Sequence, residues 1–265
     1  MPTFSTPDPI ALHVNFPAGD LVVTASDRTD TTVEVTPEHL DQGGVADYAE
    51  SVKVTHRDGV VQVKAPDGSR LRRTPSLDIV VEVPTGSRVV VETASADVRI
   101  RGRLAGVEFS SASGDLDAAH AATAIAKTAS GDVNFDVIDG VAGINTASGD
   151  VRITEARGPI TATVVSGDLV IGKASSDASI TSTSGEVSLR CVTSGKIGIR
   201  TTSGDATVAV HEGTAAWLDI NSLTGRVTSA LTQDATEPSP AEQTVEITAR
   251  SLSGGIAITR AESTR

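Results

Sequence analysis

The chain has 265 residues, with 22 Lys and Arg against 34 Asp and Glu, and carries a formal net charge of −12 at pH 7. So acidic a chain is poorly suited to bind the phosphates of nucleic acid or an anionic membrane surface, and neither partner is expected. No run of about 18 apolar residues occurs, which predicts no membrane insertion. Residues 1–9 lack the basic and apolar regions of a signal peptide, so we expect a cytoplasmic protein.

The amino-terminal stretch already shows strand periodicity. Apolar residues alternate from Leu12 to Phe16 and again from Leu21 to Val23, with Ala18-Gly19-Asp20 between them. A period of two predicts strands with one buried face, so this stretch reads as an opening coil. Thr32 to Thr36 continues as a strand. Pro37 to Glu50 is a charged excursion, with a short helix expected from Val45 to Ser51, and we interpret it as an end cap.

A hairpin is predicted next. Val52 to Thr55 and Val60 to Lys64 alternate, and Asp58-Gly59 between them is a two-residue turn sequence. The loop that follows, Asp67 to Thr74, holds the only basic cluster of the chain: Arg70, Arg72 and Arg73. Strand alternation then returns at Leu77 to Val83.

From about residue 91 one unit recurs, and it is clearest in Thr146 to Ile153. We number each copy from its corner Ser or Thr as position zero. Those residues are Ser95, Ser113, Ser130, Ser148, Ser166, Ser184, Ser203, Thr224 and Ser253, with Ala18 in the same role in the opening coil. Successive spacings from Ser95 onward are 18, 17, 18, 18, 18, 19, 21 and 29 residues. A near-constant period of this size predicts an array of small stacked units.

Four columns of the repeat are apolar, namely six and four residues before zero and three and five after it. In the copy at Ser148 they are Ala142, Ile144, Val151 and Ile153. Each unit therefore reads as a strand, a Ser-Gly-Asp corner and a second strand. Glycine in such a corner can take a positive φ, and Asp can bond nearby backbone N–H groups.

Two architectures fit this pattern: an antiparallel meander with type II′ turns, or a parallel solenoid. We favour the solenoid, because only stacking requires the same small residue in every unit. One coil buries four or five apolar side chains worth roughly 1.5–3 kcal/mol each, against a backbone ordering cost of roughly 1–2 kcal/mol per residue. A lone coil is therefore unstable, and coils must stack.

The predicted fold is all-β, a single-stranded β-solenoid or β-helix with coils of about 18 residues. We expect one domain over residues 1–265, with residues 1–90 irregular and residues 91–260 regular. Gln233 to Gln243 is a polar insertion, and Thr244 to Arg260 is expected to form the closing coil. Because the insertion and Pro37 to Glu50 are polar and contain Pro, we expect both to protect the terminal strand edges and keep the protein a monomer or small oligomer.

The repeated Ser-Gly-Asp-Val units, the opening Phe-Pro-Ala-Gly-Asp-Leu-Val-Val and the Val-Pro-Thr-Gly-Ser before the array resemble the bacterial putative-adhesin family. The resemblance covers nearly the whole chain. It implies a β-strand-repeat domain with no assigned activity and brings no catalytic residues.

A column of acidic residues follows each corner. We expect each carboxylate to cap its own turn; the alternative is a row that binds a hard cation such as Ca²⁺. Its members are Asp20, Asp97, Asp115, Asp132, Asp150, Asp168, Glu186 and Asp205, followed by Arg226 and Gly255.

Other candidate residues are few. The five His residues occupy unrelated repeat positions, so no Ser-His-Asp grouping is predicted, and no zinc-ligand spacing occurs. The single Cys191 allows no internal disulfide. Because it lies two residues after Leu189, it is expected to be a small core residue. No catalytic residue, metal or cofactor is predicted, and the possible partner contacts are Trp217, Arg70, Arg72 and Arg73.

The leading hypothesis is a non-enzymatic scaffold or adhesin-like module that binds a protein partner or itself. The alternatives are a polysaccharide hydrolase or lyase built on a β-helix, which needs convergent polar groups, and a cation-binding structural module.

Overall fold

The structure is a computed structural model that describes residues 2–37, 45–66, 76–231 and 243–261. Most of these residues lie in β-strands. The chain forms two compact units: unit 1 is Met1–Asn134 and unit 2 is Phe135–Arg265. The expected single domain with a boundary near residue 90 stays a prediction.

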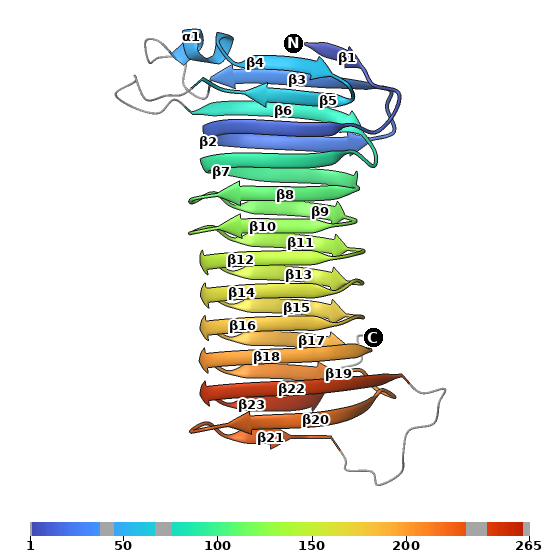
Figure 1. Cartoon of the computed structure of the whole chain (residues 1–265), viewed down its shortest axis with the longest axis vertical. Coiled ribbons are helices and arrows are strands. Elements are labelled where there is room, and N and C mark those ends of the chain that lie inside the picture. The colour runs from blue at the N-terminus through green and yellow to red at the C-terminus, as the bar shows by residue number, and fades with distance from the viewer. Residues whose placement is uncertain (1, 38–44, 67–75, 232–242, 262–265) are drawn as a thin grey trace. The chain divides into compact units, whose positions relative to one another are not determined.

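Figure 1 shows the order of the elements. In unit 1 they are β1 (Thr3–Ser5), β2 (Ala11–Ser26), β3 (Asp30–Pro37), α1 (Val45–Glu50), β4 (Lys53–Arg57), β5 (Val60–Lys64), β6 (Leu77–Pro84), β7 (Arg88–Leu104), β8 (Gly106–Ser111), β9 (Leu116–Ala121) and β10 (Ala124–Thr128). The next strand, β11 (Val133–Ile138), spans the unit boundary. In unit 2 they are β12 (Ala142–Ser148), β13 (Val151–Ala156), β14 (Ile160–Ser166), β15 (Leu169–Ala174), β16 (Ala178–Ser184), β17 (Val187–Val192), β18 (Gly195–Ser203), β19 (Ala206–Val210), β20 (Ala215–Ser222), β21 (Val227–Ser229), β22 (Thr244–Ser253) and β23 (Ile256–Arg260).

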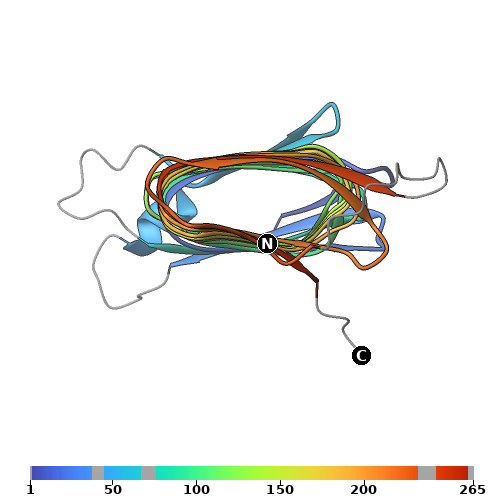
Figure 2. The same cartoon turned by 90° about the horizontal axis from the view of Figure 1, so that it is seen from below.

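The strands of unit 2 pair in parallel with their counterparts one repeat away, as β12 does with β14 and β13 with β15. Ile144 lies beside Ala162, and Ala162 lies beside Ile180, so like positions of the repeat touch. Figure 2 shows these coils, coloured yellow to red, as two facing layers joined at corners. Parallel pairing between successive coils excludes the meander and confirms the predicted β-solenoid.

The four predicted apolar columns form the core of unit 2. Val151, Leu169 and Val187 have no exposed surface, and the columns on the facing layer are equally buried. Each fully buried Val, Leu or Ile contributes roughly 1.5–3 kcal/mol. A further column, eight residues after zero, was not predicted; it holds Ala156, Ala174 and Val192, all buried.

This extra column corrects the expectation for Cys191. Strict alternation ends after Leu189 in β17, as it does after the equivalent residue of β13 and β15, so that the next inward residue comes three positions later. Val192 takes the inward place, and Cys191 is half-buried rather than part of the core. Burial still raises the pKa of its thiol.

The corner glycines are required by close approach of neighbouring coils. Gly185 has a φ of +130°, and a Cβ at this position would lie 2.0 Å from the carbonyl oxygen of Gly167. Gly167 bears the same relation to the carbonyl oxygen of Gly149, at 2.3 Å. The sequence pattern predicted glycine for its freedom of φ, and the structure adds that no side chain fits between the coils.

The end of unit 2 differs from the sequence prediction. Thr244 to Arg260 was expected to close the array, but β22 pairs with β18 on one side and with β20 on the other. Likewise β23 lies between β19 and β21. The last coil of the chain is therefore inserted between two earlier ones, and β20 and β21 form the outermost coil of unit 2.

A similar inversion occurs in unit 1. The opening strand β2 pairs in parallel with β7, with Ala18 beside Ser95 and Asp20 beside Asp97, so its columns match the repeat as predicted. On its other side β2 pairs with β5 and β6. The opening coil is therefore an interior coil of unit 1, and segments that follow it in the chain cover it.

The outer part of unit 1 is antiparallel. β3 pairs with β6, β1 with β3, and β4 with β5. The predicted hairpin is present, and both turn residues have positive φ, 51° at Asp58 and 74° at Gly59, as a type I′ turn requires. The predicted short helix is α1. Within the described residues no helix is long and apolar enough to cross a membrane.

Candidate functional site

The acidic column forms a hydrogen-bonded ladder along the corners. The backbone N–H of Glu186 donates to Asp168 Oδ1 at 2.8 Å, and the N–H of Asp168 donates to Asp150 Oδ1 at 2.9 Å. In the same way the N–H of Gly255 donates to Asp205 Oδ1 at 2.7 Å. In unit 1 the N–H groups of Asp115 and Asp132 donate to the preceding carboxylates at 3.1 and 2.8 Å.

These contacts correct the expectation that each carboxylate caps its own turn. Each one instead caps the corresponding turn of the neighbouring coil, one repeat away. The ladder lacks further acidic members after Asp205, because Gly255 has no side-chain acceptor and Arg226 is a cation. Among the described residues no three His, Cys, Asp or Glu side chains converge to hold a metal ion. Whether the row needs a cation stays a prediction.

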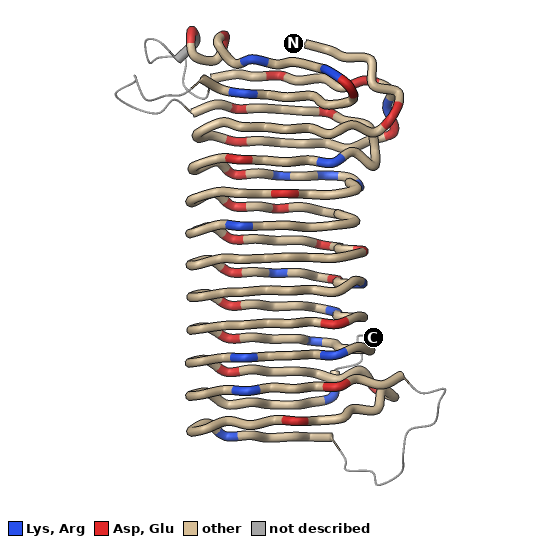
Figure 3. The backbone as a smooth tube through the Cα atoms, viewed as in Figure 1, with Lys and Arg blue, Asp and Glu red and all other residues tan. Residues whose placement is uncertain are grey.

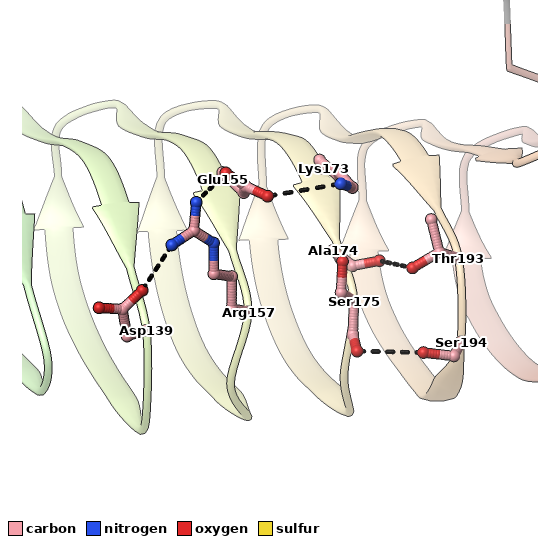
Figure 4. A network of polar contacts seen from close by, with 8 residues as sticks. All are labelled: Asp139, Glu155, Arg157, Lys173, Ala174, Ser175, Thr193 and Ser194. Carbon is pink, nitrogen blue, oxygen red and sulfur yellow. Dashed lines mark hydrogen bonds and ion pairs between the residues drawn. The ribbon is translucent and has the colours of Figure 1, made fainter.

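A second polar cluster lies on the opposite side of the coils from the ladder, in unit 2. Arg157 donates to Asp139 and to Glu155, both at 2.8 Å, and Lys173 lies 3.4 Å from Glu155 (Figure 4). The hydrogen bond from Arg157 lowers the pKa of Glu155 below its ordinary value. These groups are partly exposed and compensate one another, which is typical of a stabilising ion-pair network rather than of a reactive centre.

Unit 1 contains a comparable ion-pair cluster. Arg28 contacts both Asp30 and Glu82, and Thr32 also donates to Glu82 at 2.9 Å. The hydrogen bonds from Arg28 lower the pKa values of both carboxyl groups. Because Arg28 bonds to both carboxylates and Thr32 also bonds to Glu82, the cluster ties β3 to β6 and neither acid is without a partner.

One stretch of the surface of unit 2 carries no charge. The outward side chains of β12, β14 and β16 are in register, so that Asn145, Thr163 and Thr181 form one row. In Figure 3 these three strands show no charged residue. We call this surface the uncharged face. Its residues are Gly143, Asn145, Ala147, Ser148, Thr161, Thr163, Val165, Ser166, Ser179, Thr181, Thr183 and Ser184.

The other layer of the same coils is different. There the outward residues include Arg152, Glu155, Lys173 and Arg190. The flat face without charges is therefore specific to one side of these coils. The period-two pattern contains the signal for it, because every second residue of each strand is Thr, Ser, Gly, Ala, Asn or Val.

A cleft of about 500 Å³ lies in unit 1 between β3, α1 and β4. Its walls include Val35, Val52 and Val54, with Glu34 and Glu50 beside them. The two glutamates are exposed and the valines are half-buried. The cleft thus combines three half-buried valines with polar groups, among them two exposed glutamates.

The predicted partner contacts are placed only in part. Trp217 lies on β20 in the outermost coil of unit 2 and is 61% exposed, with its neighbour Leu218 turned inward and half-buried. Its role as a contact stays a prediction. Arg70, Arg72 and Arg73 lie outside the described residues, as do most of the two segments expected to protect the strand edges.

The fold and the surfaces together define a β-solenoid of short stacked coils with an interlocked Gly-Asp corner. A family model matches residues 11–259, and the chain belongs to the Toastrack DUF4097 family. No curated protein matches the chain.

Several solved structures share the fold. A putative adhesin from Bacteroides fragilis is 14% identical, with a TM-score of 0.51 over 97% of this chain and 95% of that one. A putative lipid binding protein from Parabacteroides distasonis is 14% identical, with a TM-score of 0.48 over 98% and 96% of the two chains. A putative adhesin from Parabacteroides merdae is 13% identical, with a TM-score of 0.42 over 98% and 95%. At these sequence identities the similarity shows a shared fold alone. This conclusion rests on the Bacteroides fragilis structure, which has the highest TM-score of the three.

Proposed function

We propose that the chain is a non-enzymatic scaffold whose uncharged face binds a protein partner. The observation that carries the proposal is the row of Asn145, Thr163 and Thr181 and its neighbours, which presents no charge on a chain of net charge −12. The cores of protein interfaces are depleted in charged residues, because burying a charge is costly. Short Thr and Ser side chains also lose little conformational entropy when a partner covers them.

The size of the face limits the kind of complex. Strands of seven residues extend about 23 Å, and three strands at about 4.8 Å spacing span about 14 Å, or roughly 300 Å². A standard interface buries about 800 Å² on each partner. A stable complex would therefore extend beyond these three strands, first onto β18, where Arg200 faces outward and Lys196 is paired with Glu246 at 3.2 Å. The partner we expect is neutral at its centre and acidic where it meets β18.

The putative adhesin from Bacteroides fragilis, which shares the fold, agrees with a binding role. The acidic groups described above also support a binding role over hydrolysis. The carboxylates of the ladder accept backbone N–H groups, and Glu155 is paired with Arg157 and Lys173.

Capture of proteins from an extract of the native host tests the proposal, with captured proteins identified by mass spectrometry and then purified for affinity measurement. Thr163→Arg places a charge at the centre of the uncharged face. Thr154→Arg places the same charge on β13, at an exposed position of the other layer. We expect a partner that the parent and Thr154→Arg retain and that Thr163→Arg loses. Retention by Thr163→Arg, or release of reducing ends from a polysaccharide by the parent, would contradict the proposal.

A further inference from the structure

In the part of the chain that the structure describes, the outermost coil of unit 2 is paired with another coil on one side only. Among the described residues, β20 pairs only with β22 and β21 only with β23, so each has one edge without a partner strand. The apolar columns nevertheless continue into this coil. Leu218 and Ile220 are half-buried and Val227 is 44% exposed, whereas Ile247, Ala249 and Ile256 in the adjacent coil are buried.

Open strand edges with apolar neighbours favour the addition of another chain. Among the described residues of unit 2, six large apolar residues are exposed, and three of them belong to this coil or the turn after β20: Trp217, Leu223 and Val227. An interior coil buries its columns against a neighbour on each side. Within the described residues no further strand pairs with this coil, so it can accept another molecule as a neighbour.

The charge of this coil restricts the choice of occupant. Its acid, Asp219, is paired with Arg250 at 2.5 and 2.9 Å. Arg226 is exposed and stands in the column where the earlier coils carry an acid and the adjacent coil has Gly255. Among the described residues of this coil, Arg226 therefore supplies a positive charge that Asp219 does not balance, beside the exposed apolar residues of β20 and β21.

The cleft of unit 1 has complementary properties. Val35, Val52 and Val54 are half-buried apolar residues on its walls, and Glu34 and Glu50 supply negative charge. Because the outermost coil and the cleft belong to different ends of the sequence, one molecule can offer each to a different copy. Such a contact is heterologous and can repeat from copy to copy.

We propose that the outermost coil of unit 2 docks onto the cleft of unit 1 in a second copy of this chain. The contact continues the apolar columns of Leu218, Ile220 and Val227 onto the valines of the cleft, and Arg226 is attracted by Glu34 and Glu50. The proposal deepens the scaffold function, on which it rests, by naming self-association as one of its interactions.

Sedimentation velocity of the full chain, from low micromolar to several hundred micromolar protein, tests the proposal. We expect the weight-average sedimentation coefficient to rise with concentration. Val227→Lys should weaken association at least tenfold. Val165→Lys is the matched control, because Val165 is also 44% exposed but lies on β14 within the stack.

A charge exchange identifies the surfaces. Arg226→Glu alone and the double variant Glu34→Arg, Glu50→Arg alone should each lose association, and a mixture of the two should regain it. A protein that stays monomeric at every concentration would overturn the proposal. So would equal weakening by Val165→Lys, or association that is indifferent to the Glu34 and Glu50 changes, which indicates contact between two unit 2 ends.

The outcome is independent of the test for a partner on the uncharged face. Val227→Lys leaves that face unchanged and should still retain the partner that Thr163→Arg loses. If that partner is found but the chain does not self-associate, only the present inference fails. If the chain self-associates but retains no partner through the uncharged face, the inference stands and the uncharged-face proposal fails.

Discussion

Asp168 Oδ1 accepts the backbone N–H of Glu186, the residue that occupies the same repeat position in the next coil, at 2.8 Å. Contacts between neighbouring coils therefore explain why the Ser-Gly-Asp corner is repeated. The carboxylate of one coil satisfies a backbone donor of the next, and the glycine beside it lets the two backbones approach.

Removal of one rung of the ladder should weaken the stack slightly. Asp168→Ala leaves the Glu186 N–H without its acceptor and should lower the free energy of unfolding by about 1 kcal/mol, because the bond is exposed to water. Asp168→Asn keeps an oxygen acceptor without the charge and should cost less than half as much. Urea denaturation of the variants measures both. Equal losses would mean that the charge, and not the hydrogen bond, matters.

A buried carboxylate should be far more damaging. Val151 is fully buried between coils, beside Leu169, so Val151→Asp should lower the free energy of unfolding by about 4 kcal/mol or more. Thr154→Asp, at an exposed outward position on the same strand, should change it by less than about 1 kcal/mol. Thermal melts followed by circular dichroism distinguish them. Similar melting temperatures would show that the inward columns are misassigned.

The ion pairs predict the direction of the pH dependence. The pKa values of Glu155, Glu82 and Asp30 are lowered in the folded protein by their bonds to arginine. Their stabilisation is complete above the unfolded pKa values, near about 4, and is lost as the pH falls through the lower folded values. The urea concentration at the midpoint of unfolding should therefore decrease as the pH is lowered below about 4.

Glu155→Gln removes one of these contributions and should make that drop shallower. Glu108→Gln removes an exposed outward glutamate from β8 and serves as the control. If Glu155→Gln follows the parent curve at every pH, the network around Arg157 does not contribute to folding.

Divalent cations should have no special effect. The carboxylates of the ladder already accept backbone N–H groups, and their mutual repulsion is relieved by simple screening. Sodium and calcium at matched ionic strength should raise the melting temperature alike. A saturable gain with calcium at sub-millimolar concentration would support the cation-binding alternative instead.

Much of the fold could be predicted because the repeat is regular. The columns at Val151 and Ile144, the hairpin at Asp58-Gly59 and the corner positions all follow from periods and turn residues near one another in the chain. The partner of each corner carboxylate could not be predicted in this way, since the donor lies in the next coil and no local pattern identifies it. Cys191 was misplaced because alternation breaks after the second inward residue of β13, β15 and β17 alike, which puts Val192 and not Cys191 inside.

The order of coils at the end of unit 2 also could not be predicted from the sequence repeat. The segments of β20 and β22 both have apolar residues at the inward positions, so either can stack on β18 by that criterion alone. One signal was available. The coil of β20 and β21 has Ser229 in an apolar column and Arg226 in the acidic one, and such a coil fits best where only one side is covered. The uncharged face could be predicted from alternate residues once the coils were stacked.

The most direct test of the account compares two glycine-to-alanine variants by equilibrium denaturation. Gly185 has a positive φ and lies against the backbone of Gly167, whereas a Cβ at Gly143 on β12 would meet nothing within 4 Å. If corners interlock as described, Gly185→Ala should lose about 3 kcal/mol or more, and Gly143→Ala should be neutral or gain up to about 1 kcal/mol. Equal effects of the two substitutions would contradict the interlocked corner and with it the rigid stack on which the proposed function depends.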